Sequence, residues 1–190
     1  MKKQITILSI SLSLLAVGVN AQHHEGHKEQ KMEHAKKTKT GQADPAFQQQ
    51  LEKVYQASLD LNDAFVASDA QKVKSTVPKV EQAVAKVDMK LLKDQAHKDW
   101  MNYSKEINSS LAKIKKTGSI DEQRRAFSTF NYALYKSIKD FGIGGETVYY
   151  QHCPMALNNT GASWLSDSKE IRNPYFGDMM LKCGSVKETL

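Results

Sequence analysis

Four consecutive segments between residues 44 and 142 carry apolar side chains at intervals of three, four or seven positions. This spacing puts the apolar residues on one face of an α-helix. Each segment is roughly 20 residues long, within the usual range for helices of globular proteins. Because only short turns separate the segments, the sequence predicts an all-α fold, an up-down four-helix bundle of antiparallel neighbours. The predicted core consists of Phe47, Leu51, Val54, Ser58, Leu61, Phe65, Val73, Val77, Val80, Val84, Val87, Leu92, Ala96, Trp100, Tyr103, Ile107, Leu111, Ile114, Phe127, Phe130, Leu134, Ile138 and Phe141.

Polar, proline and glycine residues mark the expected ends of these helices. Asp44 followed by Pro45 is typical of a helix N-terminus, with a capping side chain and a proline in the first turn. The other expected ends are a capping box of Ser68 with Gln71 at the second segment, a capping box of Ser119 with Glu122 at the fourth, and stops at Gly118 and Gly142. Pro78 lies inside the second segment and predicts a kink or a break there.

Residues 1–21 have the pattern of a secretory signal peptide. Lys2 and Lys3 precede an apolar run over residues 5–19, and small residues before Gln22 suit a cut after Ala21. The run is too short for a confident membrane span, so we expect no stable membrane insertion after cleavage. We therefore expect a periplasmic or secreted protein in an oxidising compartment. The formal net charge of +6 is mild and forms no basic stripe, so nucleic acid is not an expected partner.

Residues 22–44 follow as a polar linker that we expect to be disordered, because the stretch lacks a core-forming period. Four of the six histidines of the chain lie here: His23, His24, His27 and His34. Imidazole is a good ligand for Cu(II), Ni(II) and Zn(II), so the linker is a candidate for weak, secondary metal binding. A solvated linker that merely contains histidines is the open alternative.

The main domain is expected over residues 45–190, and its last part, residues 143–190, differs in kind from the helices. Helical periodicity disappears there, residues 148–151 suggest a short extended piece, and residues 178–182 suggest a helical turn. The same part contains both cysteines of the chain beside further soft donors. The candidate metal ligands are His152, Cys153, Met155, Met179, Met180 and Cys183. Thiolate and thioether ligands suit Cu(I), and by the same softness Ag(I).

Helical geometry would bring two of these donors together. If residues 178–183 form an α-helix, Met179 and Cys183 are four positions apart and share a face. Zinc could take both cysteines and His152, but zinc has little use for methionine. Tyr149, Tyr150, Trp164, Tyr175 and Phe176 could form an apolar wall that excludes water from such a site.

A simple disulfide between Cys153 and Cys183 is the main alternative in an exported protein. It would close a loop of about 30 residues and stabilise the domain by about 3 kcal/mol on the chain-entropy view. The spacing of the cysteines leaves disulfide and metal ligation both open, and the neighbouring histidine and methionines favour the metal.

Two readings of Cys153 imply more chemistry. A catalytic thiol beside His152 is one, although adjacent residues rarely have the mutual geometry that a thiol and its base need. A blue-copper site is the other, since it uses histidine, cysteine and methionine. It needs a second histidine near Cys153, and outside the linker only His97, expected at the surface, could supply it. No nucleophile motif or nucleotide fingerprint appears, so we expect no enzyme.

Two strings in the last part resemble a known family. The strings are H-C-P-M-A-x-N-N-x-G-A-x-W-L-S from His152 to Ser166 and I-R-N-P-Y-F-G-D-x-M-L-K-C-G from Ile171 to Gly184. They resemble a bacterial family of exported helical domains of unknown function. That family is similar to the extra C-terminal domain of periplasmic adaptor subunits of copper/silver efflux systems. The resemblance is weak over the helices from Phe47 and strong over residues 149–190.

The resemblance implies a metal context through association with efflux. Carried over to this chain, it points to His152, Cys153, Met155, Met180 and Cys183. The chain has no room for barrel or hairpin domains, so it is not itself an adaptor. The resemblance implies, as possible partners, a heavy-metal efflux adaptor or another envelope metal protein.

The sequence therefore predicts an exported protein that binds Cu(I) or Ag(I) in metal buffering, delivery or efflux, with a role in heavy-metal resistance and without catalysis. The alternative is a non-catalytic interaction module of the cell envelope, stapled by a Cys153–Cys183 disulfide.

Overall fold

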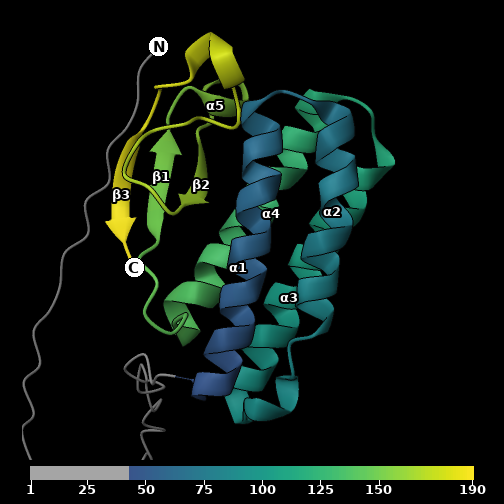
Figure 1. The fold of residues 1–190 in the computed structure, drawn as a ribbon, viewed down its shortest axis with the longest axis vertical. Coiled ribbons are helices and arrows are strands. Elements are labelled where there is room, and N and C mark those ends of the chain that lie inside the picture. The colour runs from purple at the N-terminus through teal and green to yellow at the C-terminus, as the bar shows by residue number, and fades with distance from the viewer. Residues whose placement is uncertain (1–42) are drawn as a thin grey trace, which may run out of the picture. The chain divides into compact units, whose positions relative to one another are not determined.

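The computed structural model describes residues 43–190. The predicted signal peptide and all but the end of the predicted linker, including His23, His24, His27 and His34, lie outside the described residues. Four long helices dominate the described part: α1 (Pro45–Val66), α2 (Ala70–Ala85), α3 (Asp94–Lys116) and α4 (Ile120–Phe141). They lie side by side, with a small sheet beside them (Figure 1). The mostly helical fold that the apolar spacing predicts is confirmed.

Several of the predicted helix ends are confirmed at the level of atoms. The Asp44 carboxylate accepts a hydrogen bond from the Ala46 N–H at 2.8 Å, and Pro45 lies in the first turn of α1. The Ser119 hydroxyl accepts from the Glu122 N–H at 3.4 Å at the start of α4. Gly142 ends α4 with a φ of 76°, a left-handed conformation that suits glycine.

The predicted capping box at the start of α2 is wrong. Asp69 is the cap, and its carboxylate accepts from the N–H groups of Gln71 and Lys72. Ser68 lies one residue too early and has a φ of 54°. Its hydroxyl accepts instead from Nη2 of Arg124 on α4, at 2.8 Å.

Helix α2 also continues through Pro78, so the predicted break does not occur. Proline removes one backbone N–H and leaves the carbonyl of Lys74 without its helical partner. Pro78 is exposed, so water can reach this carbonyl, while Val77 and Val80 on either side are fully buried. Packing of the valine face thus keeps the helix intact across the proline.

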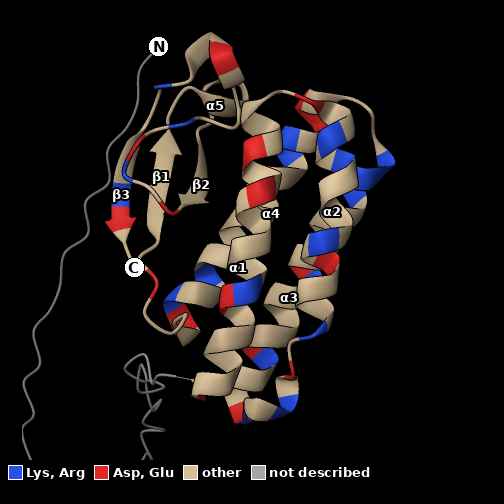
Figure 2. Cartoon of the chain, viewed as in Figure 1, with Lys and Arg blue, Asp and Glu red and all other residues tan. Residues whose placement is uncertain are grey.

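The predicted apolar positions form the core between the helices. All of them are buried except Ala96 and Tyr103, which are partly buried. Phe47 packs edge-on against Trp100 and Phe141, with ring centroids 5.3 and 5.2 Å apart. Phe65 and Phe127 stack at 4.2 Å and join α1 to α4. Charges of both signs are interspersed along the helices (Figure 2). In residues 43–190 no helix is long and apolar enough to cross a membrane.

The last part of the domain forms a three-stranded antiparallel sheet, where the sequence suggested an irregular segment. Its strands are β1 (Tyr149–Cys153), β2 (Ala162–Ser166) and β3 (Ser185–Thr189), in the order β2-β1-β3. The extended piece expected at residues 148–151 is thus the central strand. Its pairing with β3 joins residues more than thirty positions apart, and no local pattern reveals such a partner.

Helix α4 holds the sheet through three contacts of two side chains, Asn131 and Tyr135. The Leu165 N–H on β2 donates to Oδ1 of Asn131 at 3.2 Å. The Tyr135 ring stacks on Tyr150 of β1 with centroids 3.9 Å apart. The Tyr135 hydroxyl also donates to Glu188 on β3 at 2.6 Å. The sheet therefore rests on α4 over all three strands.

Short irregular elements complete the described part. A 3-10 helix, η1 (Met89–Leu91), connects α2 to α3, and a second, η2 (Gly177–Met180), precedes β3. The helical turn expected at residues 178–182 is therefore only partly formed. The turn α5 (Ala156–Asn159) connects β1 to β2, and Leu157, Asn158 and Asn159 have φ values of 52°, 60° and 62°. Left-handed backbone is tolerated by asparagine and is strained at a leucine.

Candidate metal-binding site

The sheet brings Cys153 and Cys183 together. Cys153 ends β1 and is fully buried, and Cys183 lies two residues before β3 and is partly exposed. The β1–β3 register pairs His152 with Ser185, so the chain on either side of this pair runs in close proximity. Both cysteines are free thiols. Hydrogen bonding between the two thiols is the largest influence on the pKa of Cys183.

The surroundings keep the Cys183 thiol protonated. The hydrogen bond to Cys153 raises the pKa of Cys183 above its ordinary value, and burial and the charge of Cys153 raise it further. A hydrogen bond from the backbone N–H of Met155 acts in the opposite direction and lowers that pKa. A cation that binds here must therefore displace protons, as soft metals do when they bind thiols.

Asn173 holds the chain around Cys183. Its side chain is fully buried, donates from Nδ2 to the Cys183 carbonyl at 2.8 Å, and accepts at Oδ1 from the Tyr175 N–H at 2.8 Å. The Cys183 N–H donates to the Met180 carbonyl at 3.0 Å. The position of this cysteine is thus determined by a buried amide and a turn.

Gly184 allows the two cysteine segments to approach each other. A Cβ at this position would lie 2.9 Å from Cη2 of Trp164 and 3.0 Å from the carbonyl oxygen of His152. Gly184 also has a φ of 141°. Only a residue without a side chain fits between β1 and the indole.

Trp164 and Tyr175 form a buried aromatic wall near the thiols. Trp164 on β2 is fully buried and meets Tyr175 edge-on at 6.1 Å. The Tyr175 hydroxyl donates to the Ser163 carbonyl at 2.8 Å. Of the five aromatic residues that the sequence suggested for such a wall, the other three, Tyr149, Tyr150 and Phe176, are only partly buried. The buried pair limits the access of water to Cys153.

The structure does not bring His152 to the thiols. His152 and Cys153 are consecutive residues of a paired strand, and consecutive side chains of a strand point to opposite faces of the sheet. His152 Nδ1 lies 2.9 Å from the Ser163 hydroxyl. The ring also abuts Gly161, where a Cβ would lie 2.8 Å from His152 Cε1. His152 is thus held by the β1–β2 side of the sheet.

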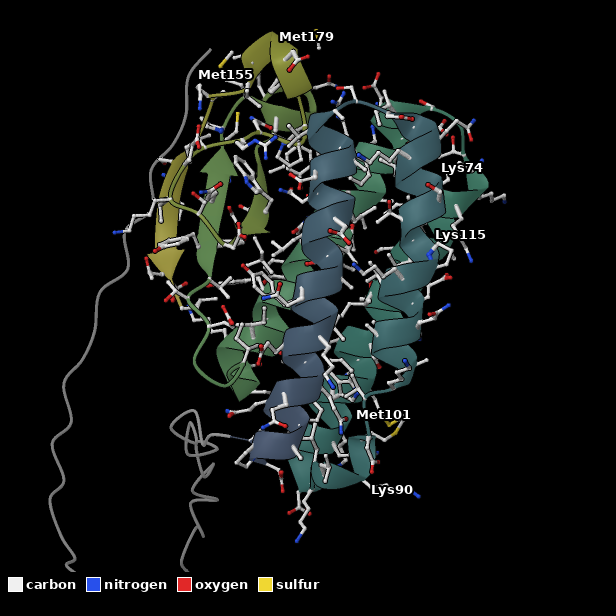
Figure 3. All side chains as sticks on the ribbon, in the orientation of Figure 1. Lys74, Lys90, Met101, Lys115, Met155 and Met179 are labelled. Atoms are coloured by element: carbon white, nitrogen blue, oxygen red, sulfur yellow. The ribbon has the colours of Figure 1, made fainter. Side chains whose placement is uncertain are left out.

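The three candidate methionines lie in different surroundings. The backbone of Met155 is a hydrogen-bond partner of the Cys183 thiol, and the Met180 carbonyl accepts from the Cys183 N–H. Of the three methionines, Met155 and Met180 therefore have their backbone beside Cys183. Met179 is 78 % exposed and lines a separate cavity with Arg124 and Leu157. Figure 3 places Met155 and Met179 at the same end of the molecule, near α5. The 3-10 helix η2 ends at Met180, so the expected α-helical face shared by Met179 and Cys183 does not form.

The remaining histidine of the described part lies apart from the cysteines. His97 is on α3, and its Nδ1 lies 3.0 Å from the carbonyl of Met89 in η1. Within residues 43–190, no group of three or more histidine, cysteine or acidic side chains is arranged to hold a metal. Any metal held at the cysteine pair must therefore take its other ligands from sulfur, backbone or solvent.

Asn173 and Gly184 are the site residues that the sequence reasoning missed. Asn173 directly precedes Pro174, and Gly184 directly follows Cys183. The sequence marks such residues as turn formers, whereas their buried contacts depend on the tertiary fold.

Comparison with known proteins finds a similarity over the helical part of the chain alone. No curated protein and no solved structure matches the chain. Nothing in these comparisons links the chain to efflux adaptors. A family model matches residues 54–146, from the middle of α1 to the loop after α4, so both motif strings lie outside the match. Over its helical part the chain is thus similar to the family described as a protein of unknown function, DUF3347.

Proposed function

We propose that the protein binds a soft metal ion, Cu(I) or Ag(I), between the thiolates of Cys153 and Cys183. The observation that carries this proposal is that the pairing of β1 with β3 brings together the segments of two free thiols that are 30 positions apart in the chain. Thiolates are the protein ligands that most favour Cu(I). The role is metal buffering, delivery or efflux in heavy-metal resistance, and it involves no catalysis.

A thioether from Met155 or Met180 is the best candidate to complete the ligand set. Both residues approach Cys183 through their backbone. His152 is a weaker candidate because its ring faces the other side of the sheet, and Met179 is weaker because it lines another cavity. Burial of Cys153 and Trp164 supports the retention of Cu(I), since a dry site slows the access of oxidants.

The scaffold in this proposal is an up-down four-helix bundle. Contacts of α1 with α2, of α2 with α3, of α3 with α4 and of α4 with α1 support that arrangement. The signal-like residues 1–21 support a periplasmic or secreted location, where an efflux adaptor or another envelope metal protein would be the partner. The linker histidines would contribute only weak secondary binding.

A Cu(I) competition titration against a chromophoric chelator tests the proposal. The full chain is used with His23, His24, His27 and His34 replaced by alanine, so that the linker does not contribute. Cys153→Ser and Cys183→Ser should each weaken Cu(I) binding by more than about tenfold, because each removes one thiolate. Met180→Leu and Met155→Leu each remove one thioether, and the variant with the weaker Cu(I) affinity identifies the methionine that completes the ligand set. Met101→Leu is the matched control, since Met101 is 51 % exposed on α3 and lies at the opposite end of the molecule from Met155 (Figure 3).

If the double variant Cys153→Ser, Cys183→Ser has the same Cu(I) affinity as the parent, the proposal is wrong. The second candidate is then the interaction module stapled by a disulfide. The same proximity favours it, because oxidation would join two cysteines whose segments the sheet already brings together. Metal analysis and a free-thiol count on protein purified without a tag separate the two candidates: bound copper with two thiols supports the metal site, and no metal with no free thiol supports the staple.

A further inference from the structure

A second candidate site is a cavity beside the turn α5 and the helix η2. A cavity of about 150 Å³ opens between the first turns of α4, the turn α5 and the helix η2. Arg124, Arg125 and Asp121 line its polar side, and Leu157, Phe176 and Met179 line its apolar side. Both motif strings contribute to the cavity: Leu157 belongs to the string over residues 152–166, and Phe176 and Met179 belong to the string over residues 171–184. The cavity lining contains neither cysteine.

Arg124 is a buried cation with unused donors. Its side chain is only 6 % exposed. Nε donates to the Pro174 carbonyl at 2.9 Å, and Nη2 donates to the Ser68 hydroxyl at 2.8 Å. Among the described residues, Nη1 finds no acceptor within hydrogen-bond distance; the closest carboxylate oxygen, on Asp121, is 3.7 Å away. A guanidinium has more N–H groups than these two bonds use.

The charges around Arg124 leave a positive excess. Asp121 is the only acidic lining residue of the cavity and is 75 % exposed, so water screens its charge. Arg125, also at the cavity, adds a second positive charge. Burial lowers the pKa of Arg124 below its ordinary value, and Asp121 opposes that effect. Buried charges are normally paired and fully hydrogen-bonded, whereas Arg124 has only a long ion pair, of 3.7 Å, with the exposed Asp121.

Apart from Asn158, the rest of the cavity lining is aliphatic or aromatic, and the cavity is small. Tyr175 at its lining is buried and packs on Phe127 of α4, with centroids 6.1 Å apart, so this wall is rigid. Met179, at the outer edge, is mostly exposed and is a flexible side chain. An apolar cavity of about 150 Å³ is known to hold a molecule of the size of benzene. The available space thus fits a short apolar body next to a charged head.

We propose that this cavity binds a small organic monocarboxylate with an apolar body of about the size of a benzene ring. The carboxylate accepts from a free N–H of Nη1 of Arg124, a charge-assisted hydrogen bond. The apolar body lies against Leu157, Phe176 and Met179. Inorganic phosphate is a poorer ligand, because its second charge would meet Asp121 and its surface would leave the apolar wall unfilled.

Titration of the full chain with benzoate tests the proposal, with the backbone amide signals of Leu157 and Phe176 followed by NMR. Benzoate should give saturable shifts of these signals. Benzyl alcohol, which has the same ring without the charge, and inorganic phosphate, which has the charge without the ring, should each bind at least about tenfold more weakly. Ligands that use neither metal nor thiol make this test independent of the proposed Cu(I) site.

Variants that leave Arg124 in place identify the site. Asp121→Asn should tighten benzoate binding by about two- to fivefold, the effect of one exposed like charge. Glu122→Gln is the matched control, because it removes the same charge from the next residue of α4, which lines a different cavity, and it should change the affinity less than about twofold. Met179→Trp should block the cavity and abolish binding, and the exposure of Met179 makes the fold tolerant of this change.

Three results would overturn the proposal. One is the absence of saturable benzoate binding. Another is benzyl alcohol or phosphate binding as tightly as benzoate, which would mean a plain apolar or a plain oxyanion site. The third is benzoate binding that survives Met179→Trp unchanged, which would locate the ligand elsewhere.

Discussion

Asn173 provides the sharpest test of how the cysteine site is held. The variant Asn173→Ala removes two side-chain hydrogen bonds, one to the Cys183 carbonyl and one from the Tyr175 N–H, both 2.8 Å long. The residue is fully buried, so water cannot freely replace these bonds. Each backbone group left without a partner costs about 1–2 kcal/mol, so the free energy of unfolding should fall by about 2–4 kcal/mol.

Chemical denaturation followed by circular dichroism measures this change. Asn108→Ala is the matched control, because Asn108 is exposed on α3 and its replacement should alter stability by less than about 0.5 kcal/mol. The Cu(I) affinity of Asn173→Ala should also fall by about tenfold, the usual effect of losing a residue that orients a metal ligand. A loss of stability below about 1 kcal/mol would refute the reasoning, since the two bonds would then contribute little to the fold.

Two further predictions concern the scaffold. Pro78→Ala should stabilise the domain by about 2 kcal/mol, because alanine is favoured over proline inside a helix by about 3 kcal/mol and the looser unfolded chain offsets part of the gain; an unchanged midpoint in urea would contradict this. The Tyr135 hydroxyl and Lys139 lower the pKa of Glu188 from its ordinary value of 4.5. A carboxylate with a lowered pKa stabilises the fold above its unfolded pKa and loses this effect as pH falls through the folded value. The stability difference between parent and Glu188→Gln should therefore shrink below about pH 4.5, and a difference that stays constant from pH 6 to about pH 3 would contradict it.

Local signals predicted the helices well because local physics decides them. Asp44 and Ser119 cap their helices through their own side chains, and Gly142 ends α4 through its own backbone conformation. Ser68 fails because α2 begins one residue later, with Asp69 as its cap. Ser68 has a φ of 54° and its hydroxyl accepts from Arg124 on α4, a partner that no local pattern reveals.

The sheet was only partly predictable, since its strands pair over long stretches of chain. Residues 148–151 have an extended character in the sequence, but nothing near them specifies β3 as a neighbour. The predicted set of metal ligands was affected in the same way, because it took no account of strand pairing. His152 and Cys153 look like joint ligands when the segment is read as irregular, whereas strand pairing turns their side chains to opposite faces. Cys153 and Cys183, by contrast, were expected together, and the pairing of β1 with β3 places their segments side by side.

The matched family region and the cysteine pair occupy different parts of the chain, and contacts from α4 explain how the two parts depend on each other. Arg124 holds the Pro174 carbonyl, Asn131 holds the backbone of β2, and Tyr135 holds β1 and β3. These three residues step along α4 by seven and four positions, so one face of a single helix carries them all. The family match ends at residue 146, yet the residues that position the sheet lie within it. Substitutions in the last part of the chain can therefore alter the loops of the sheet without rebuilding the helices, provided that this face of α4 keeps its polar and aromatic anchors.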